Sequence, residues 1–266
     1  MKTRTLAVNI AVLCTAAVVA PSCGDGAGKK SRITTEQVAS EMTEYPIPSA
    51  YEITNLINRA GVAYIIDLTN PVGSAQRYLT EAKKAVNVGV YGADLAYVTT
   101  YNQTQAAMDY MKVLKKLGDE LQVSANVNAS LVYQVEKNID NKDSLISIIS
   151  QSFRDTYAFL VNNGKDAVSL QVLVGTWVEG LYIATHATTY SAKQEDMLQV
   201  VANQKQSLET LKALIQKQAD VPEVADLLTL LAPVVSEFDK VETSLSPQQL
   251  QSIGKAIEDI RSEVVK

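Results

Sequence analysis

Apolar residues recur at alternating spacings of three and four along much of this chain of 266 residues, and this periodicity most constrains its fold. The clearest case follows Ser246-Pro247-Gln248-Gln249, which has the spacing of a capping box with proline at the first helical position. The apolar residues that come next are Leu250, Ile253, Ile257, Ile260 and Val264. This spacing places all of them on one face of an α-helix.

Two further segments show the same periodicity. One contains Met197, Val201, Leu208, Leu211 and Ile215, with Gln204 as a polar interruption. The other contains Val224, Leu227, Leu228, Leu231, Val235 and Phe238, with a kink expected at Pro233. Both segments are therefore predicted to be helices that bury one face.

Short motifs predict where several helices begin and end. Ser49 to Glu52 has the spacing of a capping box, and Gly61 is placed to end the helix that the box opens. Asp220 to Glu223 has the same spacing, with aspartate as the cap. The run Asn162-Asn163-Gly164 is expected to end a helix that starts near Ser144.

These patterns together predict an all-α protein. A further helix is expected around Tyr64, Ile65 and Leu68, ending at Asn70-Pro71. No run of alternating β-branched residues bounded by turn dipeptides predicts a strand. We therefore expect residues 34–266 to form a single helical domain, a compact multi-helix bundle of about eight or nine helices with short links.

The first 22 residues have the features of a secretory signal peptide. Lys2 and Arg4 give a positive start, and the segment from Leu6 to Ala20 is almost entirely apolar. This segment is shorter than the roughly 20 residues that a membrane-spanning helix needs. Residues 23–33 are rich in glycine and charge without apolar periodicity, so they are expected to form a flexible tether.

Three processing routes are open at this point of the chain. Cleavage after Ala20 by the ordinary signal peptidase would place Pro21 first, which that enzyme tolerates poorly. Cleavage after Ser22 fits either the ordinary peptidase or lipoprotein processing, which first alkylates the Cys23 sulfur. Residues 20–23 resemble a lipobox, although leucine is commonest where Ala20 stands. Lipid attachment at Cys23 is favoured because exported proteins normally pair their cysteines, and the mature chain would hold only this one.

The charge balance argues against two classes of partner. The chain has 24 basic and 29 acidic residues, and the signal peptide removes two of the basic ones, which leaves a net charge of about −7. An acidic domain is a poor binder of nucleic acid and of anionic lipid surfaces. The expected membrane contact is therefore the lipid on Cys23, at a periplasmic or outer-membrane location in the cell envelope.

Two apolar segments, residues 86–101 and 172–186, carry glycines inside a helical pattern. Glycine within a helix costs about 1 kcal/mol relative to alanine, so each one needs a compensating reason. Their small residues are Gly89, Gly92, Ala93 and Ala96 in the first segment, and Gly175, Gly180 and Ala184 in the second, with Ala187 directly after it. The favoured interpretation is close packing of the two small faces, and the alternative is room for a ligand beside the backbone.

The same two segments carry the candidate site. Its members are Asp94, Tyr97, Tyr101, Trp177, Glu179 and Tyr182. Two neighbouring carboxyl groups could act as acid and base or bind a metal. More often such groups are capped by tyrosine hydroxyls or reach solvent, because a buried charge must be paired. The 12 tyrosines of the chain either pack at the domain boundary or line a groove for a glycan or peptide.

His186 is the single histidine. With no second histidine and no free cysteine, the usual zinc sites are excluded, and we expect no metal and no cofactor. The chain has no G-x-S-x-G motif, and its only glycine-rich run lies in the tether, with no strand before it. His186 is interpreted as a packed or surface residue.

Three segments resemble an uncharacterised family of all-helical lipoproteins from Bacteroidetes. They are NVGVYGADLAYVTTYNQ (87–103), NKDSLISIISQSFRDTY (141–157) and GTWVEGLYIAT (175–185), and the likeness covers most of residues 45–218. The resemblance implies a helical fold and a location in the envelope. It implies no activity and no active site.

The sequence therefore leaves three hypotheses of function. The leading one is a non-enzymatic envelope lipoprotein that binds a protein partner or a small ligand. The second is a hydrolase or metal-dependent enzyme that uses Asp94 and Glu179 between the two glycine-bearing helices. The third is a structural spacer.

Overall fold

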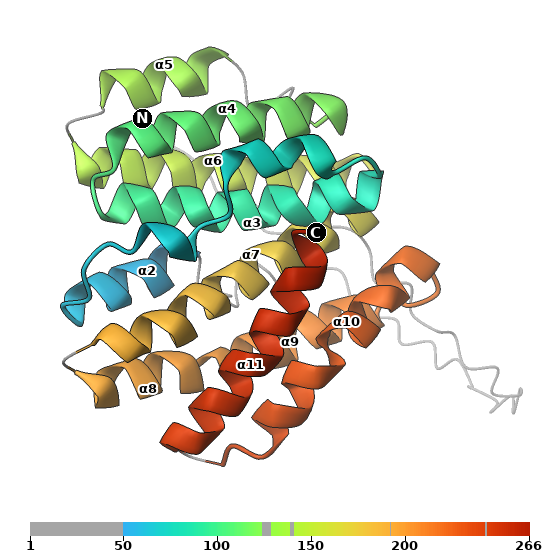
Figure 1. The fold of residues 1–266 in the computed structure, drawn as a ribbon. Coiled ribbons are helices and arrows are strands. Elements are labelled where there is room, and N and C mark those ends of the chain that lie inside the picture. Colours follow the sequence, from blue (N-terminus) through green and yellow to red (C-terminus); the bar gives the residue numbers. More distant parts are fainter. Residues whose placement is uncertain (1–49, 124–128, 139–140, 192, 243) are drawn as a thin grey trace, which may run out of the picture. The chain divides into compact units, whose positions relative to one another are not determined.

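The computed structural model describes residues 50–123, 129–138, 141–191, 193–242 and 244–266. These residues all belong to one compact unit, Thr34–Lys266. They form ten α-helices, three short 3₁₀ helices and no strand (Figure 1). The elements are α2 (Ala50–Arg59), η1 (Ile66–Leu68), η2 (Val72–Arg77), α3 (Glu81–Thr100), α4 (Thr104–Glu120), α5 (Ala129–Lys137), α6 (Lys142–Asn162), α7 (Asp166–Ala187), η3 (Thr188–Tyr190), α8 (Gln194–Ala202), α9 (Gln204–Gln216), α10 (Pro222–Asp239) and α11 (Pro247–Val264).

The prediction of an all-α bundle is confirmed for the described residues. One predicted apolar face, from Met197 to Ile215, is buried as expected, but it is shared by two helices that meet at Asn203. Gln204, the polar interruption in that face, is buried at this junction and donates from Nε2 to the Val200 carbonyl at 3.2 Å. The division of this segment brings the number of helices above the expected eight or nine.

The predicted helix ends are mostly confirmed. The Ser246 hydroxyl accepts from the Gln249 N–H at 3.2 Å, and the Gln249 side chain accepts from the Ser246 N–H at 2.9 Å. Gly61 and Gly164 have φ values of +80° and +68° just after α2 and α6 end. Such left-handed backbone favours glycine, which is why these helices stop there. The Ser49 cap lies outside the described residues.

The predicted cap at Asp220 is wrong. Helix α10 begins at Pro222, its N-cap is Val221, and no side chain caps it by a hydrogen bond. Proline is well suited to the first helical position because its fixed φ fits the helix and its missing N–H has no partner to lose. This preference places the start one residue later than a cap at Asp220 requires.

Helices α3 and α7 form the centre of the bundle (Figure 1). Helices α2, α4 and α6 pack against α3, and α7 also contacts α8, α9, α10 and α11. Nearly every residue of α3 from Ala85 onward is buried. Because these two helices are enclosed on most sides, their sequences are apolar around the whole circumference instead of along one stripe.

The crossing of α3 and α7 is built on two glycines. A Cβ at Gly89 would lie inside van der Waals contact of the Val172 carbonyl oxygen, and a Cβ at Gly175 would do the same at the Val86 carbonyl oxygen. The contact is reciprocal: Gly89 lies against the residue three positions before Gly175, and Gly175 lies against the residue three positions before Gly89. Close packing of α3 and α7, the favoured interpretation, thus accounts for these two glycines. It does not account for Gly92, which faces Phe153 of α6, or for Gly180, which faces Ile53 of α2.

The helix predicted around Tyr64 to Leu68 is not formed. This part of the chain is η1 and irregular backbone, and it lies against α3 and α4. Its backbone groups bond to tyrosine hydroxyls instead of to a helical ladder. We call the four tyrosines the tyrosine clamp. The hydroxyls of Tyr91, Tyr101 and Tyr110 donate to the carbonyls of Pro71 (3.0 Å), Val62 (2.8 Å) and Asn70 (3.0 Å), respectively. The Tyr97 hydroxyl accepts from the Ile65 N–H at 2.9 Å.

Candidate functional site

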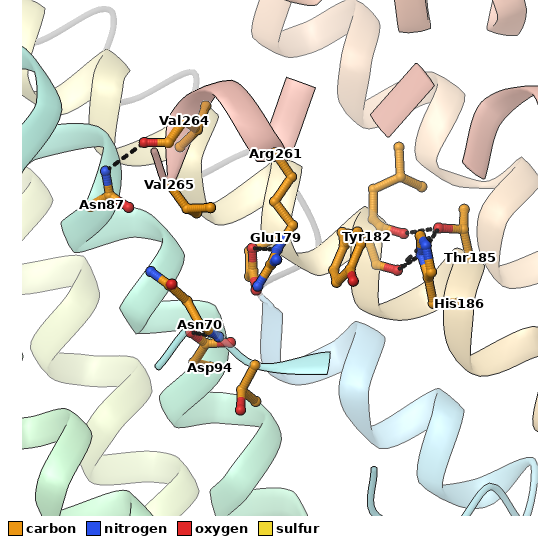
Figure 2. A network of polar contacts seen from close by, with 12 residues as sticks. Asn70, Asn87, Asp94, Glu179, Tyr182, Thr185, His186, Arg261, Val264 and Val265 are labelled. Carbon is orange, nitrogen blue, oxygen red and sulfur yellow. Dashed lines mark hydrogen bonds and ion pairs between the residues drawn. The ribbon is translucent and has the colours of Figure 1, made fainter. Parts of the chain in front are cut away.

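The glycine crossing brings the two candidate carboxyl groups together. Asp94 lies five residues after Gly89 on α3, and Glu179 lies four residues after Gly175 on α7, so both come from the same side of the crossing (Figure 2). Both side chains are completely buried, with 0% of either residue exposed. The two carboxyl groups are close enough for each to affect the pKa of the other. The sequence alone could not show this proximity.

A cation from the C-terminal helix completes the arrangement. Arg261 on α11 donates from Nε to Glu179 Oε2 and from Nη2 to Glu179 Oε1, both at 2.7 Å (Figure 2). This is a bidentate pair, the strongest geometry that a carboxylate and a guanidinium form. We call Asp94, Glu179 and Arg261 the charge cluster. It ties α3, α7 and α11 together in the middle of the bundle.

Sequence reasoning missed Arg261. It lies 82 residues from Glu179, next to Ile260 in an otherwise ordinary amphipathic helix. The signal that could have indicated it is indirect: two carboxyl groups in nearly apolar helices require a buried cation somewhere in the chain. Nothing in the spacing says which of the 24 basic residues supplies it.

The two carboxyl groups have different surroundings. The Asp94 Oδ2 atom accepts from the Asn70 N–H at 3.1 Å, but no N–H or O–H donor from the described residues reaches Oδ1. Burial, and then the negative charge of Glu179, raise the pKa of Asp94 well above its usual value. Burial also raises the pKa of Glu179, but the charge and hydrogen bonds of Arg261 act against this. The surroundings of Glu179 thus favour its charged form through Arg261, whereas those of Asp94 favour its neutral form.

Tyr182 is the third candidate that joins this arrangement. Its ring lies between the Arg261 guanidinium, 4.1 Å from the ring centroid, and the His186 ring, whose centroid is also 4.1 Å away. His186 Nδ1 is 2.9 Å from the Tyr182 carbonyl and 3.2 Å from the Thr185 hydroxyl, on its own helix (Figure 2). A cation over a tyrosine face is attracted by the ring electrons, so Tyr182 helps to hold Arg261.

The three other candidates lie elsewhere. Tyr97 and Tyr101 belong to the tyrosine clamp, and their hydroxyls hold backbone groups of residues 62–65. Trp177 is buried against Phe238 of α10, at a centroid distance of 6.4 Å. The six candidates thus serve three separate packing tasks. They do not converge on one groove.

A hollow of about 420 Å³ does lie on the surface, between α10 and α11. Its lining combines an apolar floor with acidic and hydroxyl side chains: Asp226, Thr229, Leu230, Pro233, Asp259, Ile260 and Glu263. Asp259 is 2.6 Å from Lys255 Nζ. Among the residues that the structure describes, no group of three histidine, cysteine or acidic side chains is arranged to hold a metal ion.

No protein-family profile, curated protein or solved structure matches this chain. Cys23, the candidate lipid-attachment residue, lies outside the described residues. Within the described ranges, the stretch Asp166–Tyr190 has the length and composition of a membrane span. However, 72% of its most apolar window is buried inside the bundle, because α7 is the central packing helix.

Proposed function

We propose that this chain is an exported lipoprotein of the cell envelope whose helical domain acts as an interaction module tethered to a membrane through Cys23. The observation that favours binding over catalysis is the enclosure of the charge cluster. Asp94 and Glu179 are the carboxyl groups that an enzyme would need, yet both are fully buried and engaged with Asn70 and Arg261. Neither carboxyl group is exposed in the described part of the chain, so a substrate could reach one only if the packing around it opened.

The proposed location rests on the N-terminal sequence. Residues 1–22 have the pattern of a signal peptide, Cys23 follows a lipobox-like run, and the resemblance to helical envelope lipoproteins points the same way. The acidic net charge supports a covalent lipid over electrostatic adhesion to anionic headgroups. The partner is a protein of the envelope or a small ligand, bound on the outer surface.

We expect Cys23→Ala to release the protein from membranes. Without the sulfur there is no site for acylation, and the remaining domain offers no exposed membrane-spanning helix among its described parts. Fractionation of cells into soluble and membrane pools measures the result, with Cys14→Ala as the matched control, because Cys14 lies inside the signal peptide. Retention of the Cys23→Ala protein in membranes, or a wild-type mass without fatty acid, would contradict the anchor.

A binding role predicts that a ligand stabilises the domain. A ligand present at a hundred times its dissociation constant adds about 2.7 kcal/mol to the free energy of unfolding. Thermal unfolding of the full chain against panels of divalent metals, glycans and peptides will show which class raises the melting temperature. We expect no shift from metals, since the described residues hold no metal-binding group.

Two results would favour the other hypotheses. If the wild type hydrolyses a panel member and Glu179→Gln does not, the result would support the enzyme hypothesis. If no panel member raises the melting temperature and no cross-linked complex forms in intact cells, the results would support the structural-spacer hypothesis.

A further inference from the structure

The charge cluster holds two acidic groups and one cation largely out of contact with water. Both carboxyl side chains are 0% exposed, and the Arg261 side chain is 14% exposed. One guanidinium neutralises one carboxylate. A second carboxylate in the same enclosed space would be an uncompensated buried charge, which proteins avoid by neutralising the group.

The hydrogen bonds show which carboxyl group carries the negative charge. Glu179 accepts both guanidinium bonds, so its two oxygens are already occupied by a cation. From the described residues Asp94 accepts only the Asn70 N–H, and its buried Oδ1 has no donor among them, although the negative charge of Glu179 acts on this carboxyl group. A proton on Oδ1 removes the repulsion and supplies the missing bond at once, because Asp94 then donates to Glu179.

We propose that the charge cluster is a one-proton latch for helix α11: a proton on Asp94 completes the bonding of Glu179 and Arg261, and loss of this proton loosens α11 from α3 and α7. The raised pKa of Asp94, caused first by burial and then by the charge of Glu179, agrees with this geometry.

Helix α11 is the element that opens because it covers the one side of the cluster that reaches solvent. Of the three groups, Arg261 alone is partly exposed, so water approaches an ionised Asp94 from the α11 side. Apart from the packing of its apolar face, α11 is held to the rest of the bundle by hydrogen bonds to backbone carbonyls at its C-terminal end. The Asn87 side chain donates to the Val264 carbonyl at 2.9 Å, and the Tyr78 hydroxyl donates to the Val265 carbonyl at 3.3 Å.

Other ionisable groups surround Asp94. The charge of Asp94 acts on Tyr91 on its own helix, Tyr110 on α4, Tyr64 before α3 and Tyr182 on α7. One step further away, His186 on α7 acts on Glu179, and Glu258 on α11 acts on Tyr182. Burial raises the pKa of each of these four tyrosines, so the phenols stay neutral over the relevant range. Helices α2 and α6 meet α3 through the uncharged Thr54–Thr100 and Phe153–Gly92 contacts. His186 is the group that a control variant must remove.

The latch predicts a specific dependence of stability on pH. The native state keeps a proton that unfolded Asp94 releases above its unfolded pKa of about 3.9. The stability due to Asp94 is therefore complete below that pKa and is lost as the pH rises through the native pKa. Between the two values, the unfolding equilibrium constant rises about tenfold per pH unit.

The decisive variant is Asp94→Asn in the full chain. Its amide donates to Glu179 at every pH, so we expect this contribution to the pH dependence to vanish and the unfolding constant at pH 7 to fall by up to about 1,000-fold relative to wild type. Urea unfolding followed by fluorescence of Trp177, the single tryptophan, measures this. The pair His186→Gln and Asp94→Asn/His186→Gln is the matched control, and the two pH profiles should differ from each other as wild type and Asp94→Asn do.

Amide hydrogen exchange tests the part of the proposal that concerns α11. Above the native pKa of Asp94, we expect α11 of the wild type to lose protection before α3 and α7 do, and α11 of Asp94→Asn to keep it. Equal loss in all helices would overturn the latch. So would parallel pH profiles of wild type and Asp94→Asn, or a Glu179→Gln variant that shows the stabilisation expected of Asp94→Asn.

An infrared spectrum of the wild type keeps the proposal testable even if a variant fails to fold. We expect the carbonyl band of one neutral carboxylic acid in a dry environment to persist to higher pH than the bands of the exposed carboxyl groups. A spectrum in which all carboxyl groups ionise together over the usual range would refute a retained proton on Asp94.

Discussion

Gly175→Ala is expected to cost about 3 kcal/mol or more of the free energy of unfolding, or to prevent folding altogether. The new Cβ would overlap the Val86 carbonyl oxygen and press on its carbonyl carbon, 2.8 Å away. Both atoms belong to the backbone of α3, so no side chain can rotate to make room. Urea unfolding followed by Trp177 fluorescence or by circular dichroism measures the loss.

Gly254→Ala is the matched control for this variant. Gly254 also lies within a helix, α11, but a Cβ there would be 3.7 Å from the nearest atom, Thr185 Cβ, which is an ordinary contact. Removal of a helical glycine should then stabilise the protein by up to about 1 kcal/mol. If Gly175→Ala unfolds at the same urea concentration as Gly254→Ala, the close crossing of α3 and α7 does not exist as described.

Arg261→Met is expected to destabilise the protein by about 3–5 kcal/mol, the usual cost of breaking a buried ion pair by removing one partner. Methionine keeps much of the apolar volume of arginine, so the loss reports the charge and not a cavity. Glu179 would be left in a closed space, beside Asp94, with no cation. Thermal or urea unfolding at neutral pH measures the effect.

The double variant Glu179→Gln/Arg261→Met separates the ion pair from the packing. Replacing both partners removes the unpaired charge, so we expect most of the lost stability to return and the two single losses to be strongly non-additive. Additive losses would show that Arg261 acts through its contact with Tyr182 and not through Glu179. Lys255→Met, at an exposed ion pair of the same helix, should change stability by less than about 1 kcal/mol.

Much of the fold follows from short-range patterns. The stripe from Leu250 to Val264, the Ser246 capping box and the glycines that end α2 and α6 each depend on residues within a few positions of one another. The segment around Tyr64 could not be predicted in the same way. Its local pattern is helical, but the hydroxyl groups of tyrosines more than thirty residues further along the chain bind its backbone and hold it in a conformation that is not α-helical.

The candidate site was predictable only in part. The glycine pattern marked α3 and α7 as packing partners, but it did not show whether Asp94 and Glu179 lie near each other. The pairing with Arg261 is a tertiary contact across 82 residues, which no local spacing encodes. The grouping of Trp177 with Asp94 failed for a similar reason, since Trp177 lies on α7 but points toward Phe238 of α10.

The tyrosine clamp sets how residues 62–71 can vary. The clamp holds carbonyl groups, which every residue provides, and the Ile65 N–H, which every residue except proline provides. Substitutions at outward-pointing positions such as Ile66, 68% exposed, are thus cheap, whereas Leu68 and Asn70 are buried. Insertion or deletion of one residue is costly anywhere in the segment, because it would move every later carbonyl out of step with its hydroxyl. The exposed positions are free in composition, but the segment is fixed in length.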